Sequence, residues 1–502
     1  MPRSPSDSVH DVAVVGGGPA GLAAASAAAA AGCRVVLLDA GAAPGGQFWR
    51  QSSDADAHRD GLPRDRTYAR LCTAVRSVVT YHPRRTVWTI VVAAGGFTLH
   101  TTGAGGEGVF RVAAVVLATG AFDRQLPFPG WDLPGVFTAG GVQALLKEHG
   151  VVPGRRIVVA GTGPFLLPVA VGLVTAGAPP AGVFEANRPG RWPLELLSRP
   201  GMPSLRHMHT DGDARDLAGC VAARAAEAAR YVGTLARHGV RVRARHAVIA
   251  AHGTDRVRAV TVARLGEQWT VVPGSARTVE CDTVAVGWGF TPQVELATGL
   301  GAATRLDADG SLVVTVDRRQ RTSVPGVFTA GEINGVGGAE LGVVEGEIAG
   351  RAAAAELGRA VSWPDALLRR RYALLTFARA VHRVYPVRNG WRNWLRPDTV
   401  VCRCEEVTAA EAAAAVDELG ARDERSVKLL TRTGMGWCQG RMCGFAVGRL
   451  VADGAPGNPR SVAERPLATP VRLGELANGP GPAAAAPGSA DDPAEPGQKE
   501  AG

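Results

Sequence analysis

The chain has 502 residues, of which 46% are hydrophobic, so it is long enough for two to four domains with cores of their own. The net charge is +9, but only three of the 55 basic residues are lysines and only 5% of residues are aromatic, so the basic stripe interleaved with aromatics that binds nucleic acid is missing. No apolar run approaches the ~20 residues of a transmembrane helix, the first ten residues lack the apolar core of a signal peptide, and no disulfide framework is visible, so we expect a cytoplasmic protein.

The first predicted element is a complete strand–helix–strand unit. A short apolar run leads into a glycine-rich turn, an alanine-rich helix follows, and a second apolar strand ends at Asp39. Gly16 permits the tight turn, Gly18 lets the backbone approach a pyrophosphate, and Gly21 lets the helix and the strand pack closely. Free N–H groups at the start of the helix hold the phosphates, and Asp39 is placed to bond ribose hydroxyls. The pattern predicts a Rossmann-like dinucleotide-binding domain.

A second unit of the same kind follows further along the chain. Residues 50–115 form an excursion from the first domain, and an apolar strand that breaks at Gly120 returns to it. A second glycine-rich turn follows the strand at 156–160, with Glu185 at the expected distance beyond it. Leu166 stands where the motif has its third glycine, and we expect a leucine there to push the helix from the strand and to crowd a pyrophosphate. A second Rossmann-like fold is therefore predicted, while its use of NAD(P) stays open.

The C-terminal part is predicted to contain an arginine-rich connector over 359–399, a cysteine-containing segment over 400–452 and a disordered tail over 478–502, rich in Gly, Pro, Ala and Ser. Eight arginines lie between 369 and 396, and Asp365 is the one acidic residue of the connector before the last of them. Such a run is usually a solvated face. The alternative is that it offsets the negative charge of a thiolate cluster packed beside it.

Two close pairs of cysteines, C-x-C and C-x4-C, enclose the segment 400–452: Cys402, Cys404, Cys438 and Cys443. Crowded thiolates repel one another unless a cation lies among them, so the pairs indicate a metal site. Two pairs suit a [2Fe-2S] cluster, whose two irons each take two cysteines. A structural zinc site is the alternative, although C-x-C is less usual there than C-x2-C. Thr408 and Glu411 fit a capping box at a helix start between the pairs.

Three motifs resemble the fingerprints of the flavoproteins with two dinucleotide-binding domains, the class of thioredoxin and ferredoxin reductases: 16–21, 117–120 and 327–332. The resemblance spans 9–358. The motifs at 123–131 and 335–340 restrict it to a smaller group within this class. With the cysteine motifs, the chain is similar to the FAD subunits of opine oxidases, hydrogen cyanide synthase and hydroxyproline or proline dehydrogenases. Its last segment resembles the [2Fe-2S] domain named for bacterioferritin-associated ferredoxin.

This resemblance implies an α/β fold with two Rossmann-like (FAD/NAD(P)-binding) three-layer domains and a small helical [2Fe-2S]-binding domain. The FAD-binding domain would comprise 9–148 and 288–358, with an NAD(P)-like, degenerate or intact, domain at 149–287 between them. Asp39 replaces a common Glu of the family, and Glu332 replaces the usual Asp that bonds the ribityl chain, so both contacts should survive with changed reach. The residues expected to bind FAD are Gly16, Gly18, Pro19, Ala20, Gly21, Asp39, Gly46, Gln47, Ala118, Thr119, Gly120, Gly331, Glu332, Gly338 and Ala339.

The resemblance also implies a function as an oxidoreductase subunit that relays electrons within a hetero-oligomer. A second flavoprotein subunit of the amino-acid oxidase type would oxidise an amino acid, imino acid or opine. Two alternatives are an NAD(P)H-dependent flavin reductase that passes electrons to its own cluster, and a non-enzymatic iron–sulfur carrier or interaction module with a degenerate flavin fold. A disulfide reductase is disfavoured because residues 1–400 contain no C-x2-C. No catalytic acid or base can be named from the sequence.

Overall fold

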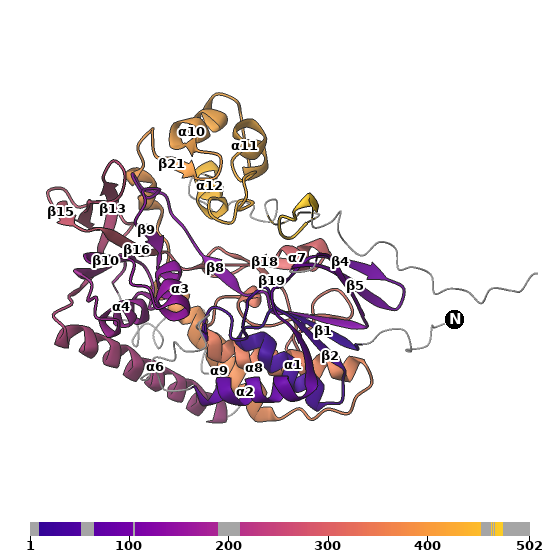
Figure 1. Ribbon diagram of the computed structural model, residues 1–502. Helices are drawn as coiled ribbons and strands as arrows, with labels where there is room; N and C mark the ends of the chain where they lie inside the picture. Colours follow the sequence, from indigo (N-terminus) through magenta and orange to yellow (C-terminus); the bar gives the residue numbers. More distant parts are fainter. Residues whose placement is uncertain are drawn as a thin grey trace, which may run out of the picture.

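The computed structural model describes residues 10–51, 65–103, 106–188, 211–452, 463, 465 and 467–474. The fold is mixed α/β, with two Rossmann-like sheets and a small C-terminal domain that contains helices (Figure 1). The disorder expected for 478–502 concerns residues outside this range. No helix in the described part is long and apolar enough to cross a membrane.

The first sheet has five parallel strands in the order β20-β7-β1-β2-β3. Its strands are β1 (Val12–Val15), β2 (Val35–Leu38), β3 (Val79–His82), β7 (Ala114–Leu117) and β20 (Val327–Thr329). All but β3 are fully buried, as is typical of parallel strands covered on both faces. One face carries α1 (Pro19–Ala30), α2 (Arg66–Val78) and α8 (Ala339–Glu356), and the other an antiparallel sheet of β4 (Arg85–Ala93), β5 (Gly96–Gly103) and β6 (Gly108–Val112).

The second sheet is also parallel, in the order β12-β11-β10-β16-β9. Its strands are β9 (Val136–Thr138), β10 (Ile157–Gly161), β11 (Gly182–Glu185), β12 (Val242–Ala244) and β16 (Thr283–Gly287). One face packs on α3 (Ala139–His149) and α4 (Leu166–Thr175), and the other on β13 (His246–His252), β14 (Ala259–Arg264) and β15 (Arg277–Glu280). Each Rossmann-like domain therefore has the three layers that the family resemblance implies.

Short elements lie where the chain passes between the two domains. The outgoing strand β8 (Ala121–Asp123) pairs antiparallel with the returning strand β17 (Phe290–Pro292). Beyond β17 follow α7 (Glu295–Gly299), the hairpin of β18 (Thr304–Leu306) and β19 (Leu312–Val314), and the short helix η4 (Glu332–Asn334) after β20. These elements bring both glycine-rich turns to a common region.

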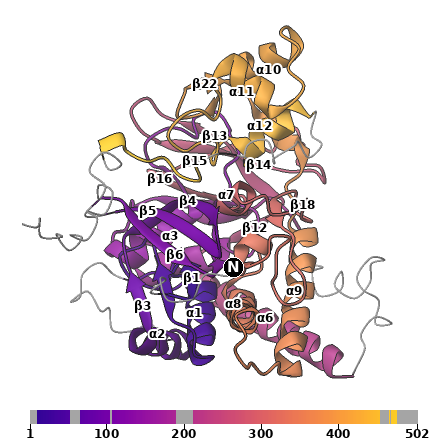
Figure 2. The ribbon, with the colours of Figure 1, turned by 90° about the vertical axis from the view of Figure 1, so that its right-hand side faces the viewer.

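The arginine-rich connector is largely a helix, α9 (Asp365–Val384), followed by η5 (Asn389–Trp394). It packs against the long helix α6 (Asp211–Arg237) and against α8. Its arginines pair with carboxylates there: Arg369 with Asp216 at 3.7 Å, and Arg370 with Glu340. Figures 1 and 2 show the cysteine-containing domain at the opposite end of the molecule from α6 and α8. The hypothesis that these arginines offset the charge of a thiolate cluster is therefore wrong for α9.

The C-terminal domain is built from β21 (Val400–Cys402), β22 (Val407–Thr408), α10 (Ala409–Asp417), α11 (Glu424–Thr431) and α12 (Gly444–Val451) around its own small core. The predicted capping box is confirmed, since Thr408 and Glu411 bond each other's backbone N–H groups at the start of α10. The domain docks on the core of the second sheet, since Phe445 and Ala446 of α12 lie in one hydrophobic cluster with residues of β10 and β16. The Arg124 guanidinium also lies 4.0 Å from the centroid of the Phe445 ring. Trp131 also donates from Nε1 to the Val400 carbonyl at 2.6 Å.

Candidate functional site

The first glycine-rich turn joins β1 to α1 with very little space around it. A Cβ at Gly21 would overlap the carbonyl oxygen of Gly16, and one at Gly17 would overlap the carboxylate of Asp39. Gly16 also needs its positive φ of 104°. Gly18 differs, because its backbone is extended and a Cβ there would meet nothing nearer than the Cα of Gly46, at 3.9 Å. Gly16, Gly17 and Gly21 are thus needed for packing, whereas the space in front of Gly18 is open.

That open space belongs to a cavity of about 1400 Å³ between the two domains. Fourteen of the fifteen residues expected to bind FAD line it, from the first glycine turn, the segment after β2, the loop after β7, the loop after β20 and the start of α8. Gly21 is the exception, since it faces the Gly16 carbonyl instead. Residues far apart in the sequence therefore converge on one space large enough for a dinucleotide.

Two acidic side chains occupy different parts of this cavity. Asp39 is 7% exposed and accepts from Gly41 N at 3.1 Å and from the Tyr81 hydroxyl at 3.3 Å. Glu332 accepts from Gly338 N at 2.9 Å, which closes the turn before α8. Burial raises the pKa of Glu332, while the hydrogen bond from Gly338 lowers it. Both carboxylates retain acceptor capacity toward a ligand in the cavity.

Sequence reasoning missed the wall of the cavity that α9 provides. Leu374, Phe377, Ala378 and Val381 lie on one side of this helix and line the cavity. His382 follows them, and its Nε2 lies 2.7 Å from the Val336 carbonyl oxygen. The spacing i, i+3, i+4, i+7 of the four apolar residues is the signal that could have identified this face.

The second glycine-rich turn, after β10, is closed by its own acidic residue. Glu185 is 5% exposed and accepts from Gly163 N at 2.9 Å, from the Thr162 hydroxyl at 2.9 Å and from Asn187 N at 2.8 Å. The Gly163 N–H, which the motif would offer to a pyrophosphate, is directed toward this carboxylate. Burial raises the pKa of Glu185 to about 7, although the three hydrogen bonds by themselves lower it.

The expected effect of Leu166 is wrong. Leu166 is 2% exposed and packs in the core between α4 and the sheet, and it does not line the cavity. Room for it is provided by Gly287 on β16, where a Cβ would lie 3.1 Å from a methyl group of Leu166. The neighbouring strand thus compensates for the missing glycine, and helix and strand stay packed. The structural argument against a nucleotide here comes from Glu185.

Replacing Glu185 by Gln should reduce the pH dependence of stability. Because the pKa of Glu185 is about 7 in the fold and 4.5 ordinarily, the folded state binds the extra proton between these values, and its stability falls as pH rises through them. The loss amounts to about 3 kcal/mol at most. Gln stays neutral, so the drop in melting temperature from about pH 5 to about pH 8 should shrink by a few degrees. Glu280→Gln, an exposed position, is the control, and an equal slope in wild type and Glu185→Gln would contradict the prediction.

The four cysteines meet in the C-terminal domain as two facing pairs. Cys402 and Cys443 are buried and share a hydrogen bond, which lowers the pKa of Cys402 to about 6 and raises that of Cys443. Cys438 and the exposed Cys404 also share a hydrogen bond. Two pairs of thiols fit the two irons of a [2Fe-2S] cluster better than one zinc ion.

One arginine inside the second cysteine motif connects the two sites. Arg441 pairs with Glu295 at 3.1 Å and donates to the Ala468 carbonyl at 2.5 Å, and Arg441 and Glu295 both line the large cavity. Arg403, in the first motif, is exposed. Of the two arginines within the cysteine motifs, only Arg441 lines the cavity.

Comparison with known proteins identifies both parts of the chain. Residues 10–356 match the pyridine nucleotide-disulphide oxidoreductase family, and residues 400–453 match the BFD-like [2Fe-2S] binding domain. The chain is 33% identical to hydrogen cyanide synthase subunit HcnB of Pseudomonas protegens, over 87% of this chain and 91% of that one. It is 32% identical to an opine oxidase subunit of Rhizobium meliloti, over 94% and 88%. The crystal structure of L-proline dehydrogenase from P. horikoshii shares the fold, with a TM-score of 0.65 at 18% identity over 93% and 79%.

Proposed function

This chain belongs to the pyridine nucleotide-disulphide oxidoreductase family and carries a BFD-like [2Fe-2S] binding domain, and we propose that it relays electrons between these two cofactor sites within an amino-acid, imino-acid or opine dehydrogenase complex. It is an FAD-dependent oxidoreductase by family. The observation that carries the proposal is the single cavity that contains the expected FAD residues and extends to Arg441, inside the second cysteine motif. A short path between a flavin and a cluster is what a relay requires.

The residues present fit both groups. The turn at Gly16–Gly18 and the start of α1 would hold the pyrophosphate through backbone N–H groups, Asp39 would bond the ribose, and Glu332 the ribityl chain. Cys402, Cys404, Cys438 and Cys443 would hold the cluster. When bound, FAD supplies a two-electron carrier and the [2Fe-2S] cluster a one-electron carrier. The protein's own contribution is position: Glu295 and Arg441 pair between the two sites and keep the cysteine loop against the cavity.

The partner in this proposal is a second flavoprotein subunit of the amino-acid oxidase type. The relatives from hydrogen cyanide synthase and opine oxidase are by name subunits of larger enzymes. The face of the cavity toward α6 and α9 carries Arg224 paired with Glu227 and Glu340, but no acid–base arrangement recognisable as a substrate site in the described residues. Substrate choice therefore belongs to the partner in this proposal. A cytoplasmic location stays a prediction of the sequence.

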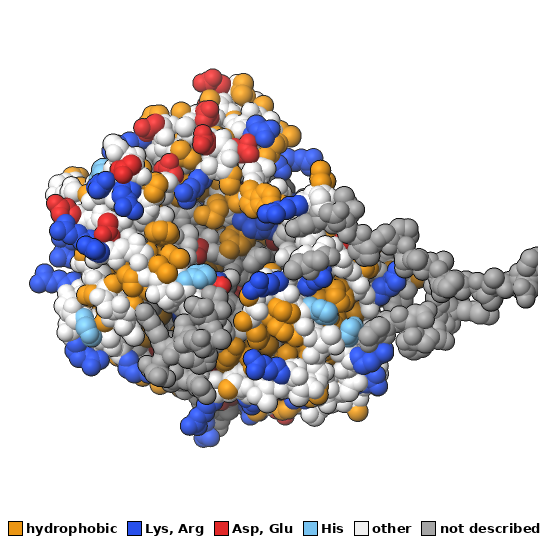
Figure 3. Space-filling model, in the orientation of Figure 1, with side chains coloured by type: hydrophobic (Ala, Val, Ile, Leu, Met, Phe, Trp, Pro, Cys, Tyr) orange, Lys and Arg blue, Asp and Glu red, His pale blue; other side chains and the backbone are white. Residues whose placement is uncertain are grey.

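The NAD(P)H-dependent reductase is the second candidate, because the second Rossmann-like domain keeps its complete parallel sheet and its glycine-rich turn. Glu185 disfavours it, since its carboxyl group accepts the Gly163 N–H that a bound pyrophosphate would need. The non-enzymatic carrier is disfavoured by the retained cavity and by the family match. Figure 3 shows basic side chains scattered over the visible face and not gathered in a stripe, in keeping with a partner other than nucleic acid.

The purified chain, loaded with both cofactors, is expected to be reduced slowly if at all by NADH and to be inert toward amines. Co-expression with a flavoprotein encoded beside it should restore amine-dependent dye reduction. Stopped-flow absorbance of the flavin, with a panel of opines and imino acids, measures both. Rapid amine oxidation by the lone chain would refute the relay, and rapid flavin reduction by NADH would favour the reductase.

A further inference from the structure

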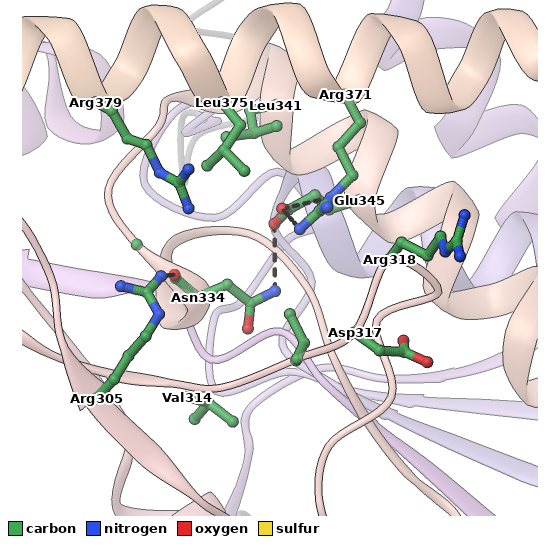
Figure 4. A pocket seen from close by; sticks show the side chains of 12 residues that line it. Arg305, Val314, Asp317, Arg318, Asn334, Leu341, Glu345, Arg371, Leu375 and Arg379 are labelled. Atoms are coloured by element: carbon green, nitrogen blue, oxygen red, sulfur yellow. Dashed lines mark hydrogen bonds and ion pairs between the residues drawn. The ribbon is translucent and has the colours of Figure 1, made fainter. Parts of the chain in front are cut away.

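A second, smaller cavity lies on the other side of α9 from the flavin cavity. It has a volume of about 180 Å³ and is bounded by α9, α8, η4 and the strands β18 and β19 (Figure 4). Four arginines line it against two carboxylates, so its lining carries a net positive charge. Neither the family match nor the relatives' names assign a role to it.

The carboxylates near this cavity already have partners. Glu345, almost fully buried, pairs with Arg371 at 3.0 Å, and Asp307 pairs with Arg305 at 2.7 Å. Asp317 accepts from two backbone N–H groups of its own turn. Arg379 has no hydrogen bond or ion pair within the described part of the chain. Burial and the charges of Arg305, Arg371 and Arg383 lower the pKa of Arg379, and the nearby Asp307 carboxylate offsets this only in part. An anion between Arg305 and Arg379 would reduce the remaining repulsion.

We propose that this cavity binds a small oxyanion, either inorganic phosphate or a short carboxylate, between Arg305 and Arg379. Figure 4 shows both guanidinium groups directed into the cavity from opposite walls. The planar fork of arginine suits phosphate and carboxylate oxygens alike. Leu341 and Leu375 form an apolar wall beside them, which suits the carbon chain of a short carboxylate. The cavity is far too small for a dinucleotide.

The site is linked to the flavin loop through Glu345. Its carboxylate pairs with Arg371 at 3.0 Å, and its Oε2 accepts from Asn334 Nδ2 at 3.3 Å, inside the same cavity, and from Gly331 N at 3.1 Å. An anion that draws Arg371 toward itself would weaken the hold of Arg371 on Glu345. The position of Gly331, which lines the flavin cavity, would then respond. Occupancy of this site is thus coupled to the loop expected to bind FAD, whether or not the relay proposal holds.

Calorimetric titration of the cofactor-loaded chain with sodium phosphate and, separately, with sodium succinate tests the site, with sodium chloride at matched ionic strength as the blank. We expect saturable binding of at least one anion, weakened at least about tenfold by Arg379→Gln. Arg369→Gln, the same charge change on the same helix outside the cavity, should bind as the wild type does. No saturable binding in the wild type, or equal weakening by both substitutions, would overturn the proposal. Comparison of the phosphate and succinate titrations shows which of the two anions the cavity binds.

The link to Gly331 has its own measurement. The same anion should produce a small, saturable change in the flavin absorption spectrum of the wild type, and the change should be absent in Arg379→Gln. Because the spectrum reports the flavin surroundings and not turnover, failure of the relay proposal would leave this result intact. Anion binding without any spectral change would show that Glu345 does not transmit occupancy to the flavin loop.

Discussion

A chain with Cys443 replaced by alanine is expected to lose its iron and sulfide, falling from about two of each per chain to near zero. Cys443 is 3% exposed at the start of α12 and faces Cys402, so its removal leaves one iron with a single protein thiolate in a buried position. No other described cysteine lies close enough to replace it, since Cys33, Cys72, Cys220 and Cys281 belong to the cores of other parts of the fold. Metal and sulfide analysis with electron paramagnetic resonance of the reduced protein measures the loss.

Cys281→Ala is the matched control, because Cys281 is also 3% exposed and lies in the core of the second Rossmann-like domain. Both substitutions leave a similar void, so loss of stability alone should affect them alike. The control should keep its full content of iron and sulfide. Zinc without sulfide in the wild type would show that the four thiols form a structural zinc site.

The second large effect is expected from Gly18→Val, which should yield protein without FAD. Gly18 has φ −76° and ψ −174°, values that valine adopts freely, and a Cβ there has no neighbour nearer than 3.9 Å. The backbone conformation and the added Cβ are therefore accommodated, and we expect the two methyl groups of valine to occupy the part of the cavity where the pyrophosphate would approach the backbone. Loss of the flavin absorption bands, with an unchanged far-ultraviolet circular dichroism spectrum, is the expected result.

Gly21→Val and Gly219→Val make this experiment specific. At Gly21 the side chain would overlap the Gly16 carbonyl, so that variant should fail to fold, whereas Gly219 is an exposed helix position with nothing within 4 Å and should keep its FAD. A Gly18→Val chain with a full complement of FAD would mean that the pyrophosphate lies elsewhere in the cavity.

Several features of this protein were predictable from the sequence because they are local. The turn at Gly16–Gly21 combines a strand, a helix and an acidic residue within about 25 positions, and each requirement is a property of neighbouring residues. The same holds for the capping box at Thr408 and for the spacing of the cysteines. The convergence of the FAD residues could be expected only through family resemblance, since Gly331 reaches Gly16 through sheet order and not through sequence distance.

Other features were decided by tertiary contacts. The prediction that Leu166 pushes the helix from the strand was wrong, because Gly287, far along the chain on a neighbouring strand, provides the space for its side chain. The sequence suggested that the arginines of α9 offset the charge of the cluster. The helix instead packs against α6 and α8, and carboxylates of those two helices pair with Arg369, Arg370 and Arg371.

The sequence by itself determined the kinds of site this protein carries, because the glycine spacing predicts a dinucleotide site and the paired thiols predict a metal site within a few residues. The tertiary structure alone decided how those sites are used: that Glu185 closes the second turn, that Arg441 and not Arg403 lies toward the flavin cavity, and that Arg379 is left without a partner among the described residues. Each of these depends on which distant side chain comes within about 3–4 Å, the range over which hydrogen bonds and ion pairs act.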